Sequence, residues 1–424
     1  MKKPSKQTAA EALKGLERYC RNRDYSGYSK FDALNSPILE RVFGSFSLGR
    51  LLITQLVNRI PLPLRPLFGV RKGRNPKGVA NFVKGYCLSY SVYRSANTLD
   101  AIKILSDWLL ANTSKRHGVY DGEGTAWGYH FPWQSPGFFA PRHYPNCIVT
   151  VFCAEALLEA YKLTQESRFL AGALGAAEFI TKGLPVLEST SEHLCIGYVP
   201  APLRWRVINI NAVSAGFLAK LGIRTQRAEY VSAAKRMIRW VVAARNPDYS
   251  WNYTSPKSQS GIGPDNYHTG GILDGIADYM LATGDYSFEH EYRKGLSYYS
   301  QNFFTMDRAP KWRAHRNFPN DIHGAAQGIL THCKAEHFQP GHLAFAEEIL
   351  AWTLSHMVGP DGNFYYQKFP YFTWKLDLMR WSNSWMFWAM NSYQILVDKF
   401  GSVSQRKRTY DSTFPSTPKV EANI

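Results

Sequence analysis

The sequence predicts an all-α protein built from about five or six helical hairpins. From Pro76 onwards apolar residues recur at helical spacing in one segment after another, and the alternating runs typical of strands never persist. The helices are joined by short turns that end in an aromatic residue, and these residues are separated by 61, 58 and 57 positions: Phe169, Tyr230, Phe288 and Phe345. Such a repeat fits two helices plus one long connection. If the hairpins close into a ring, the long connections meet on one rim.

Composition divides the chain into three parts. Residues 1–75 form a basic N-terminal segment, residues 76–400 carry the hairpins, and residues 401–424 form a polar tail that we expect to be flexible. Within the first part, the stretch 41–77 mixes leucine, isoleucine and phenylalanine with arginine and lysine. Two interpretations fit this stretch. It either wraps its own domain, stiffened by prolines, or makes peripheral contact with a membrane or a partner.

The charge balance points to an acidic partner. The 424 residues carry a formal net charge of +17, which favours an acidic polysaccharide or oligosaccharide, a nucleic acid or a membrane surface. No DNA- or RNA-binding signature accompanies the charge, so we expect no nucleic acid partner. The 12 tryptophans, 25 tyrosines and 24 phenylalanines either fill a large core or line a groove on which sugar rings stack.

Localisation and cofactor use are predicted from what the sequence lacks. Six scattered cysteines are typical of reduced, buried thiols, and the start of the chain has no apolar signal-peptide core. We therefore expect a cytoplasmic protein, with the inner membrane face as the site of any peripheral contact. No convincing metal or nucleotide motif occurs, so no metal and no other cofactor is expected.

The stretch from Tyr249 to Tyr286 shows the plan of one repeat. An aromatic loop with Trp251 and Tyr253 leads through glycines and prolines into a helix with one apolar stripe. Asp265 and Asn266 suit the N-cap of this helix, and Gly284 suits its C-terminal end. Polar and aromatic residues thus gather where a long loop enters a helix.

The other long loops contain similar groups. Aromatic rings offer stacking faces for sugars, and guanidinium groups pair with carboxylates. Each group has an alternative interpretation without function, as part of the core or of a solvent-exposed loop. The candidate substrate-binding residues are Trp127, Tyr129, His130, Arg142, Trp251, Tyr253, Trp312, Arg313, Arg316, Arg380 and Trp381.

Repeated helical hairpins with aromatic, glycine-rich loops resemble the (α/α) toroids, or six-hairpin barrels. These include unsaturated-glucuronyl hydrolases, the helical domains of heparin and alginate lyases, and uronyl epimerases. The resemblance covers 76–400. The motifs NPKG (75–78), DNYHTGGILDG (265–275), DIH (321–323) and RWSNSWM (380–386) are also similar to uncharacterised bacterial proteins of polysaccharide-biosynthesis loci. The resemblance implies an (α/α) toroid and a carbohydrate-active enzyme of polysaccharide biosynthesis.

Asn266, Tyr267 and His268, with Asp321 and His323 at the next corresponding helix start, are the candidate catalytic residues. Abstraction of the C5 proton of a uronate needs a base, an acid and a group that neutralises the carboxylate. Toroidal uronate lyases use Asn, Tyr, His and Arg for this purpose, so the resemblance implies an epimerase or a lyase by residue type.

Three alternatives stay open. In the first, the five candidate catalytic residues only cap helices or fill the core. In the second, the protein is a glycan-binding module, or an assembly protein at the membrane surface, without activity. In the third, it is a glycoside hydrolase, which needs two carboxylates about 5 to 10 Å apart. The candidate carboxylates for a hydrolase are Asp265, Asp274, Asp278 and Asp321.

Overall fold

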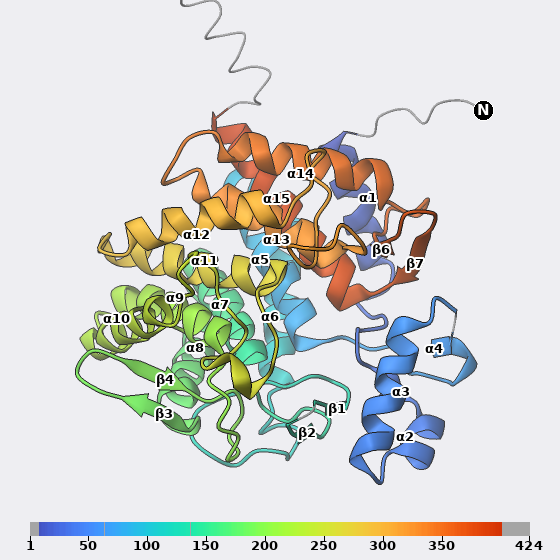
Figure 1. Ribbon diagram of the computed structural model, residues 1–424, viewed down its shortest axis with the longest axis horizontal. Helices are drawn as coiled ribbons and strands as arrows, with labels where there is room; N and C mark the ends of the chain where they lie inside the picture. The colour runs from blue at the N-terminus through green and yellow to red at the C-terminus, as the bar shows by residue number, and fades with distance from the viewer. Residues whose placement is uncertain (1–7, 63, 136, 401–424) are drawn as a thin grey trace, which may run out of the picture.

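A closed ring of six helices forms the centre of the computed structural model, which describes residues 8–62, 64–135 and 137–400 (Figure 1). Each ring helix packs against the next along the chain, and the last packs against the first. The predicted all-α toroid of helical hairpins is thereby confirmed. The inner helices are α5 (Pro76–Tyr93), α7 (Cys147–Thr164), α9 (Ile208–Thr225), α11 (Asn266–Thr283), α13 (Ile322–Ala335) and α15 (Ser384–Phe400).

A second set of helices covers the outside of the ring. Five of them follow an inner helix and pack on it, while the sixth position, on α15 and α14, is taken by α1 from the N-terminal segment. Because an outer helix returns the chain between successive inner helices, the inner helices run in one direction. The outer helices are α1 (Ala9–Arg21), α6 (Ala96–Ala111), α8 (Ser167–Glu178), α10 (Ala228–Ala243), α12 (Glu289–Asn302) and α14 (His342–His356).

Short strands occur in the long connections and pair only locally. Two antiparallel pairs and one antiparallel sheet of order β5-β6-β7 are present in the described residues, and β5 leads directly into α13. The strands are β1 (Trp133–Gln134), β2 (Phe139–Ala140), β3 (Val186–Ser189), β4 (Leu194–Ile196), β5 (Asn320–Asp321), β6 (Tyr365–Lys368) and β7 (Thr373–Asp377).

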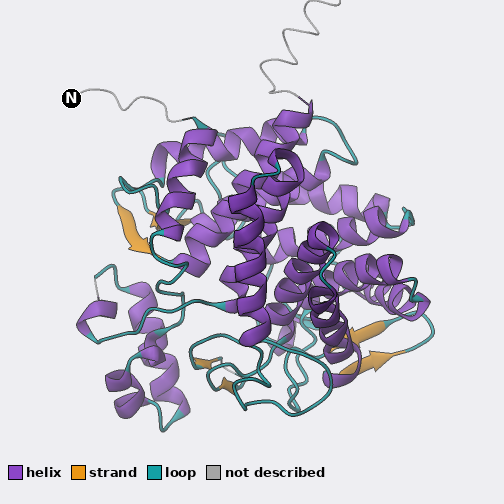
Figure 2. Cartoon of the chain, turned by 180° about the vertical axis from the view of Figure 1, so that it is seen from behind, coloured by secondary structure: helices purple, strands orange, loops and turns teal. Residues whose placement is uncertain are grey.

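Three helices from the N-terminal segment form a lobe that stands apart from the ring in both views (Figures 1 and 2). This α2–α4 lobe comprises α2 (Pro37–Phe43), α3 (Ser47–Arg59) and α4 (Leu64–Leu67). It has a small core of its own, separate from the main core. The buried guanidinium of Arg65 donates from Nε to Asp32 at 2.8 Å and fixes α4 to the chain before α2.

Local signals set the helix ends. Asp265 caps α11 by accepting a hydrogen bond from the His268 backbone, and Gly284 ends it with a φ of 71°, as the sequence predicts. All six cysteines are free and buried, which confirms the predicted thiols. In the described part of the chain, no helix is long and apolar enough to cross a membrane. The tail at 401–424 lies outside the described residues.

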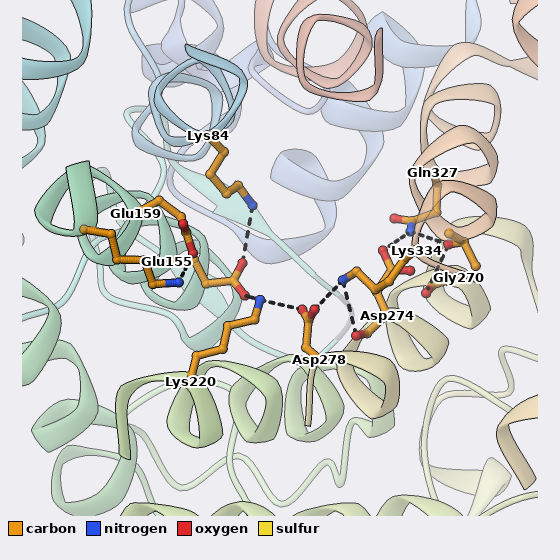
Figure 3. Close-up of polar contacts among 11 residues, drawn as sticks. Lys84, Glu155, Glu159, Lys220, Gly270, Asp274, Asp278, Gln327 and Lys334 are labelled. Atoms are coloured by element: carbon orange, nitrogen blue, oxygen red, sulfur yellow. Dashed lines mark hydrogen bonds and ion pairs between the residues drawn. The ribbon is translucent and has the colours of Figure 1, made fainter. Parts of the chain in front are cut away.

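A chain of largely buried charges links five of the inner helices toward their C-terminal halves (Figure 3). Glu155 on α7 contacts Lys84 at 3.4 Å and Lys220 at 3.1 Å, and Asp278 on α11 contacts Lys220 and Lys334 at 2.7 Å each. Burial raises the pKa of Asp278, but the ammonium groups of Lys220 and Lys334 outweigh it and lower this pKa to about 2. The alternating charges therefore connect neighbouring inner helices from α5 to α13.

Candidate active site

A cavity of about 270 Å³ lies at the N-terminal end of the ring. It is lined by the first turns of α5, α7, α9, α11 and α13 and by the segment that leads into α15. The amino ends of parallel helices carry unpaired N–H groups and partial positive charge. The backbone therefore favours negative charge in this cavity before any side chain is considered.

The same helical position lines the cavity in five repeats. In α5, α7, α9, α11 and α13, the residue two positions after the N-cap lines the cavity. In four of these helices, the residue four positions further along lines it too. A spacing of four places both on one helix face. The residues two after the cap are Lys77, Ile148, Asn209, Tyr267 and His323, and those one turn later are Phe152, Val213, Gly271 and Gln327.

His268 is oriented by a buried carboxylate. Its Nδ1 lies 2.7 Å from Oδ2 of Asp265, whose side chain is 2 % exposed, while the imidazole is one-quarter exposed. Arg313 stands behind Asp265, with its guanidinium 3.9 Å from Oδ2. A carboxylate at Nδ1 leaves Nε2 as the nitrogen that exchanges protons with a bound molecule. The arrangement suits a general base.

His323 is the second imidazole of the cavity. Its ring stacks on Tyr267 with a centroid distance of 4.9 Å and an interplanar angle of 18°, and packs edge-on against Trp381 at 4.3 Å. Burial holds the pKa of His323 well below its usual range, and the charges of Lys77, Lys30 and Arg380 lower it further. Nδ1 of His323 is buried without a hydrogen-bond partner in the described residues. The ring is thus an uncharged imidazole with unused hydrogen-bonding capacity.

The ring of Tyr267 contacts both imidazoles, His323 as above and His268 at a centroid distance of 4.6 Å. Burial, together with the nearby carboxylates of Asp265 and Asp321, raises the pKa of Tyr267 well above its usual range. The phenol therefore stays protonated near neutral pH. It is suited to donate a hydrogen bond or a proton and is unsuited to act as a base.

Two cationic side chains face the cavity without an ion pair to any carboxylate of the described residues. Arg380 is buried, donates from Nη2 to the carbonyl of Lys30 at 2.9 Å, and lies over the ring of Tyr129 at 5.0 Å. Lys77 is also buried, with Nζ 4.0 Å from the centroid of Phe152. Burial lowers the pKa of Lys77 well below its usual range, and the charges of Arg380 and Lys84 add to this. Arg380 retains its charge because a guanidinium does not deprotonate in proteins.

Two of the candidate catalytic residues are held by the fold and do not line the cavity. Asn266 is fully buried; its amide donates to the carbonyl of Phe303 at 3.2 Å and accepts from Tyr299 at 2.9 Å. Asp321 accepts from the Trp381 indole at 2.8 Å, from Gln367 at 2.9 Å and from the backbone of His323 at 3.0 Å. These contacts position His323 and Trp381 from behind.

The candidate substrate-binding residues fall into two groups. Tyr129, Tyr253, Arg380 and Trp381 line the cavity, with Tyr253 packed against His268 at 4.7 Å. The others lie behind it or away from it. The indoles of Trp127 and Trp251 are buried in the core and donate to helix carbonyls, His130 is buried against Asn75, Arg313 backs Asp265, and Arg142, Trp312 and Arg316 do not line the cavity.

Sequence reasoning missed Lys77 as a cavity residue. The signal was present in the NPKG motif, because Asn75 caps α5 as Asp265 caps α11, and two residues after each cap stand Lys77 and Tyr267. Aligning the repeats on their caps would have found it. Trp133, Phe152 and Trp385 also line the cavity and were not predicted.

Carboxylates are absent from the cavity wall. Among the described residues, no Asp or Glu side chain lines it, and Asp274 and Asp278 face the opposite end of the ring. The described residues also hold no group of three or more His, Cys, Asp or Glu side chains arranged for a metal ion. The polar chemistry on offer is therefore that of imidazole, phenol, amide, amine and guanidinium.

Solved structures with the same fold include carbohydrate enzymes, although sequence comparison alone finds no relative. No protein-family model matches the sequence, and no curated protein matches it. The chain is similar to a sugar epimerase from a ruminal bacterium (12% identity, 77% of this chain and 90% of that one, TM-score 0.61).

It is likewise similar to a cellobiose 2-epimerase from Bacillus thermoamylovorans (12% identity, 77% and 90%, TM-score 0.58) and to an unsaturated glucuronyl hydrolase specific for heparin (14% identity, 92% and 97%, TM-score 0.56). At these identities the comparison establishes the shared (α/α)6 toroid fold.

Proposed function

We propose that the protein is a carbohydrate epimerase that moves the C5 proton of an acidic, uronate-type sugar unit. One observation carries the proposal: two imidazoles and an unpaired buried guanidinium face one cavity whose described wall contains no carboxylate. Epimerases and a glucuronyl hydrolase among the structures of like fold are consistent with a sugar in this cavity.

His268 takes the proton. Asp265 orients the imidazole through Nδ1 at 2.7 Å and stabilises the imidazolium that forms when Nε2 accepts a proton. The His268 side chain is one-quarter exposed, whereas His323 is buried. His323, held by Asp321 and Trp381 from behind, is uncharged before a substrate binds. Once a bound carboxylate offsets the charges of Lys77 and Arg380, its imidazole takes up a proton from solvent and returns it to the other face of the planar intermediate. The ring of Tyr267 contacts both imidazoles, so its phenol can donate a hydrogen bond on either side.

Arg380 and Lys77 bind the carboxylate and the negative charge that develops next to it. Burying a guanidinium without a counter-ion is costly, and a bound carboxylate removes that cost. The amine of Lys77 supplies hydrogen bonds from the start of α5, and the amino ends of the inner helices add their partial positive charge. Charge that appears only in the transition state is stabilised by groups already in place.

A glycoside hydrolase receives less support. That chemistry uses two carboxylates across the bond to be broken. Asp265 and Asp321 instead serve His268 and Trp381, and Asp278 belongs to the ion chain at the other end of the ring. The cavity volume of about 270 Å³ is at the small end for ligand sites, which favours a single sugar unit or a chain end.

Exchange with heavy water tests the proposal. The full chain is incubated with uronic acids and short uronate oligosaccharides, and with neutral reducing sugars as the matched panel. We expect deuterium at C5 of an acidic sugar, formation of its C5 epimer, and loss of both in His268→Asn. A new C4–C5 double bond would identify a lyase instead. Exchange confined to neutral sugars would show that the substrate is a neutral sugar and not a uronate. No exchange with either set of sugars would overturn the proposal.

A further inference from the structure

Exposed apolar side chains are concentrated on the α2–α4 lobe. Eight large apolar side chains between positions 38 and 67 are exposed, against thirteen in all other described residues together. Monomeric proteins rarely expose contiguous patches of this kind without a function for them. The eight are Ile38, Val42, Phe46, Leu48, Leu52, Leu56, Leu62 and Leu67, with exposed fractions from 47% to 73%.

Helical spacing places these side chains on shared faces. Leu48, Leu52 and Leu56 follow one another at intervals of four along α3, and Ile38 and Val42 have the same spacing on α2. The opposite face of α3 is buried within the lobe, through residues such as Ile53 and Val57. The exposed face is therefore a surface of a folded unit and has no partner within the described chain.

Cations border this apolar face. Arg41 lies one turn from Ile38 on α2, and Arg59 lies one turn from Leu56 on α3. Neither forms an ion pair with a described residue, nor does exposed Arg71, which follows α4. From position 33 to position 99 the only acidic residue is Glu40. The lobe thus combines apolar side chains with positive charge that is almost unopposed.

We propose that the α2–α4 lobe docks on an anionic membrane surface, with α3 lying in the interface and its leucines inserted among the lipids. An amphipathic helix with leucines on one face and arginines at its border binds in this way. Anionic headgroups supply the counter-charges that the lobe lacks. A protein partner or a second copy of the chain would have to present a matching acidic rim, and the chain itself carries a net charge of +17.

Docking would also fix the position of the cavity. The lobe packs on β1, and Arg50 of α3 donates to Gln134 of β1 at 2.8 Å. Trp133, the other residue of β1, lines the cavity. The lobe therefore holds the wall of the cavity close to the membrane surface. This inference does not depend on the reaction that the cavity performs.

Vesicle flotation with the full chain tests the inference. We compare vesicles of phosphatidylcholine alone with vesicles of equal parts phosphatidylcholine and phosphatidylglycerol. The protein should float with the mixed vesicles and release in high salt. Replacing Leu48, Leu52 and Leu56 by glutamine should weaken binding by on the order of fivefold per leucine, since each loses about half of a leucine burial. Arg41→Gln with Arg59→Gln should weaken binding to the mixed vesicles by on the order of 30-fold, since each cation near an anionic surface contributes about 1 kcal/mol.

A control variant tests whether removing exposed apolar side chains elsewhere on the protein also weakens membrane binding. Val92, Ile104 and Ile223 are similarly exposed but lie outside the lobe, and their replacement by glutamine should leave flotation unchanged. Circular dichroism checks that every variant is folded. Equal binding to both vesicle types, loss of binding in the control, or wild-type binding by the leucine variant would overturn the inference. So would absence of flotation combined with a wild-type dimer that the leucine variant converts to a monomer.

Discussion

Asp265→Asn separates the chemical role of this carboxylate from its structural one. Asp265 accepts the His268 backbone N–H at 3.0 Å through Oδ1 and contacts His268 Nδ1 at 2.7 Å through Oδ2. Asparagine caps a helix about as well as aspartate, so the first contact survives. The second contact changes, because an amide N–H now faces Nδ1. The ring must then carry its proton on Nε2, where it can no longer accept one from a sugar.

The magnitude follows from the contact that is lost. A hydrogen bond to a charged group contributes about 1.5 to 3 kcal/mol, and each 1.4 kcal/mol corresponds to a tenfold change in rate. Asp265→Asn should therefore lower the rate of deuterium exchange by about 10- to 100-fold. The melting temperature should change little, because the cap remains and the volume of the side chain is nearly the same.

The assay is the initial rate of deuterium incorporation at saturating substrate, with the melting temperature measured in parallel. Asp285→Asn is the matched control, because this carboxylate lies just beyond the other end of α11 and accepts from Tyr279 at 2.8 Å, away from the cavity. A wild-type rate in Asp265→Asn, or the same loss in both variants, would refute the base role of His268.

Further substitutions probe the cavity and the ring. Gly271→Leu should abolish activity, because the new side chain fills the cavity that Gly271 lines. The same change should stabilise α11 by about 1 kcal/mol, because a Cβ there meets no atom within 4 Å, and lowered stability would argue against this placement. Arg380→Gln should raise KM by on the order of 100-fold for acidic substrates; an unchanged KM would remove Arg380 from binding. Lys220→Met should cost about 1.5 to 3 kcal/mol in urea unfolding, because Asp278 and Glu155 each keep a second lysine partner. Breaking the exposed pair by Lys162→Met should cost at most about 1 kcal/mol, and equal costs would contradict the ion chain. Because the pKa of Asp278 is lowered to about 2, its carboxylate contributes fully to the free energy of unfolding above about pH 4, and this contribution is lost as the pH falls toward 2. In Asp278→Asn the free energy of unfolding should fall less over this range, as measured by unfolding at a series of acidic pH values.

Much of the ring was predictable because its signals are local. Apolar spacing, the cap at Asp265 and the glycine at position 284 mark helix ends within a few residues. The sixth outer helix was not predictable in this way. α1 packs on α15, and Tyr19 donates a hydrogen bond to Asp377, so the pairing joins residues from opposite ends of the described chain. No local pattern encodes such a contact.

The candidate site was predictable only where helical register applies. Tyr267 and His323 both stand two residues after a cap, and that register brings them together. The loops have no such rule. Trp127 and Tyr129 lie two positions apart in the same loop, yet the indole enters the core and the phenol ring lines the cavity. Whether an aromatic ring of this loop faces the core or the cavity depends on how the whole loop packs against the helices.

The central claim is that one imidazole removes the proton and the other returns it. His323→Asn tests this most directly, by following deuterium in recovered substrate and epimer formation in the same reaction. With His268 and Asp265 intact, we predict that the variant still exchanges the substrate proton with heavy water but forms epimer at least about 100-fold more slowly. Epimer formation at the wild-type rate, or loss of exchange and epimerisation in equal proportion, would contradict the division of labour between His268 and His323.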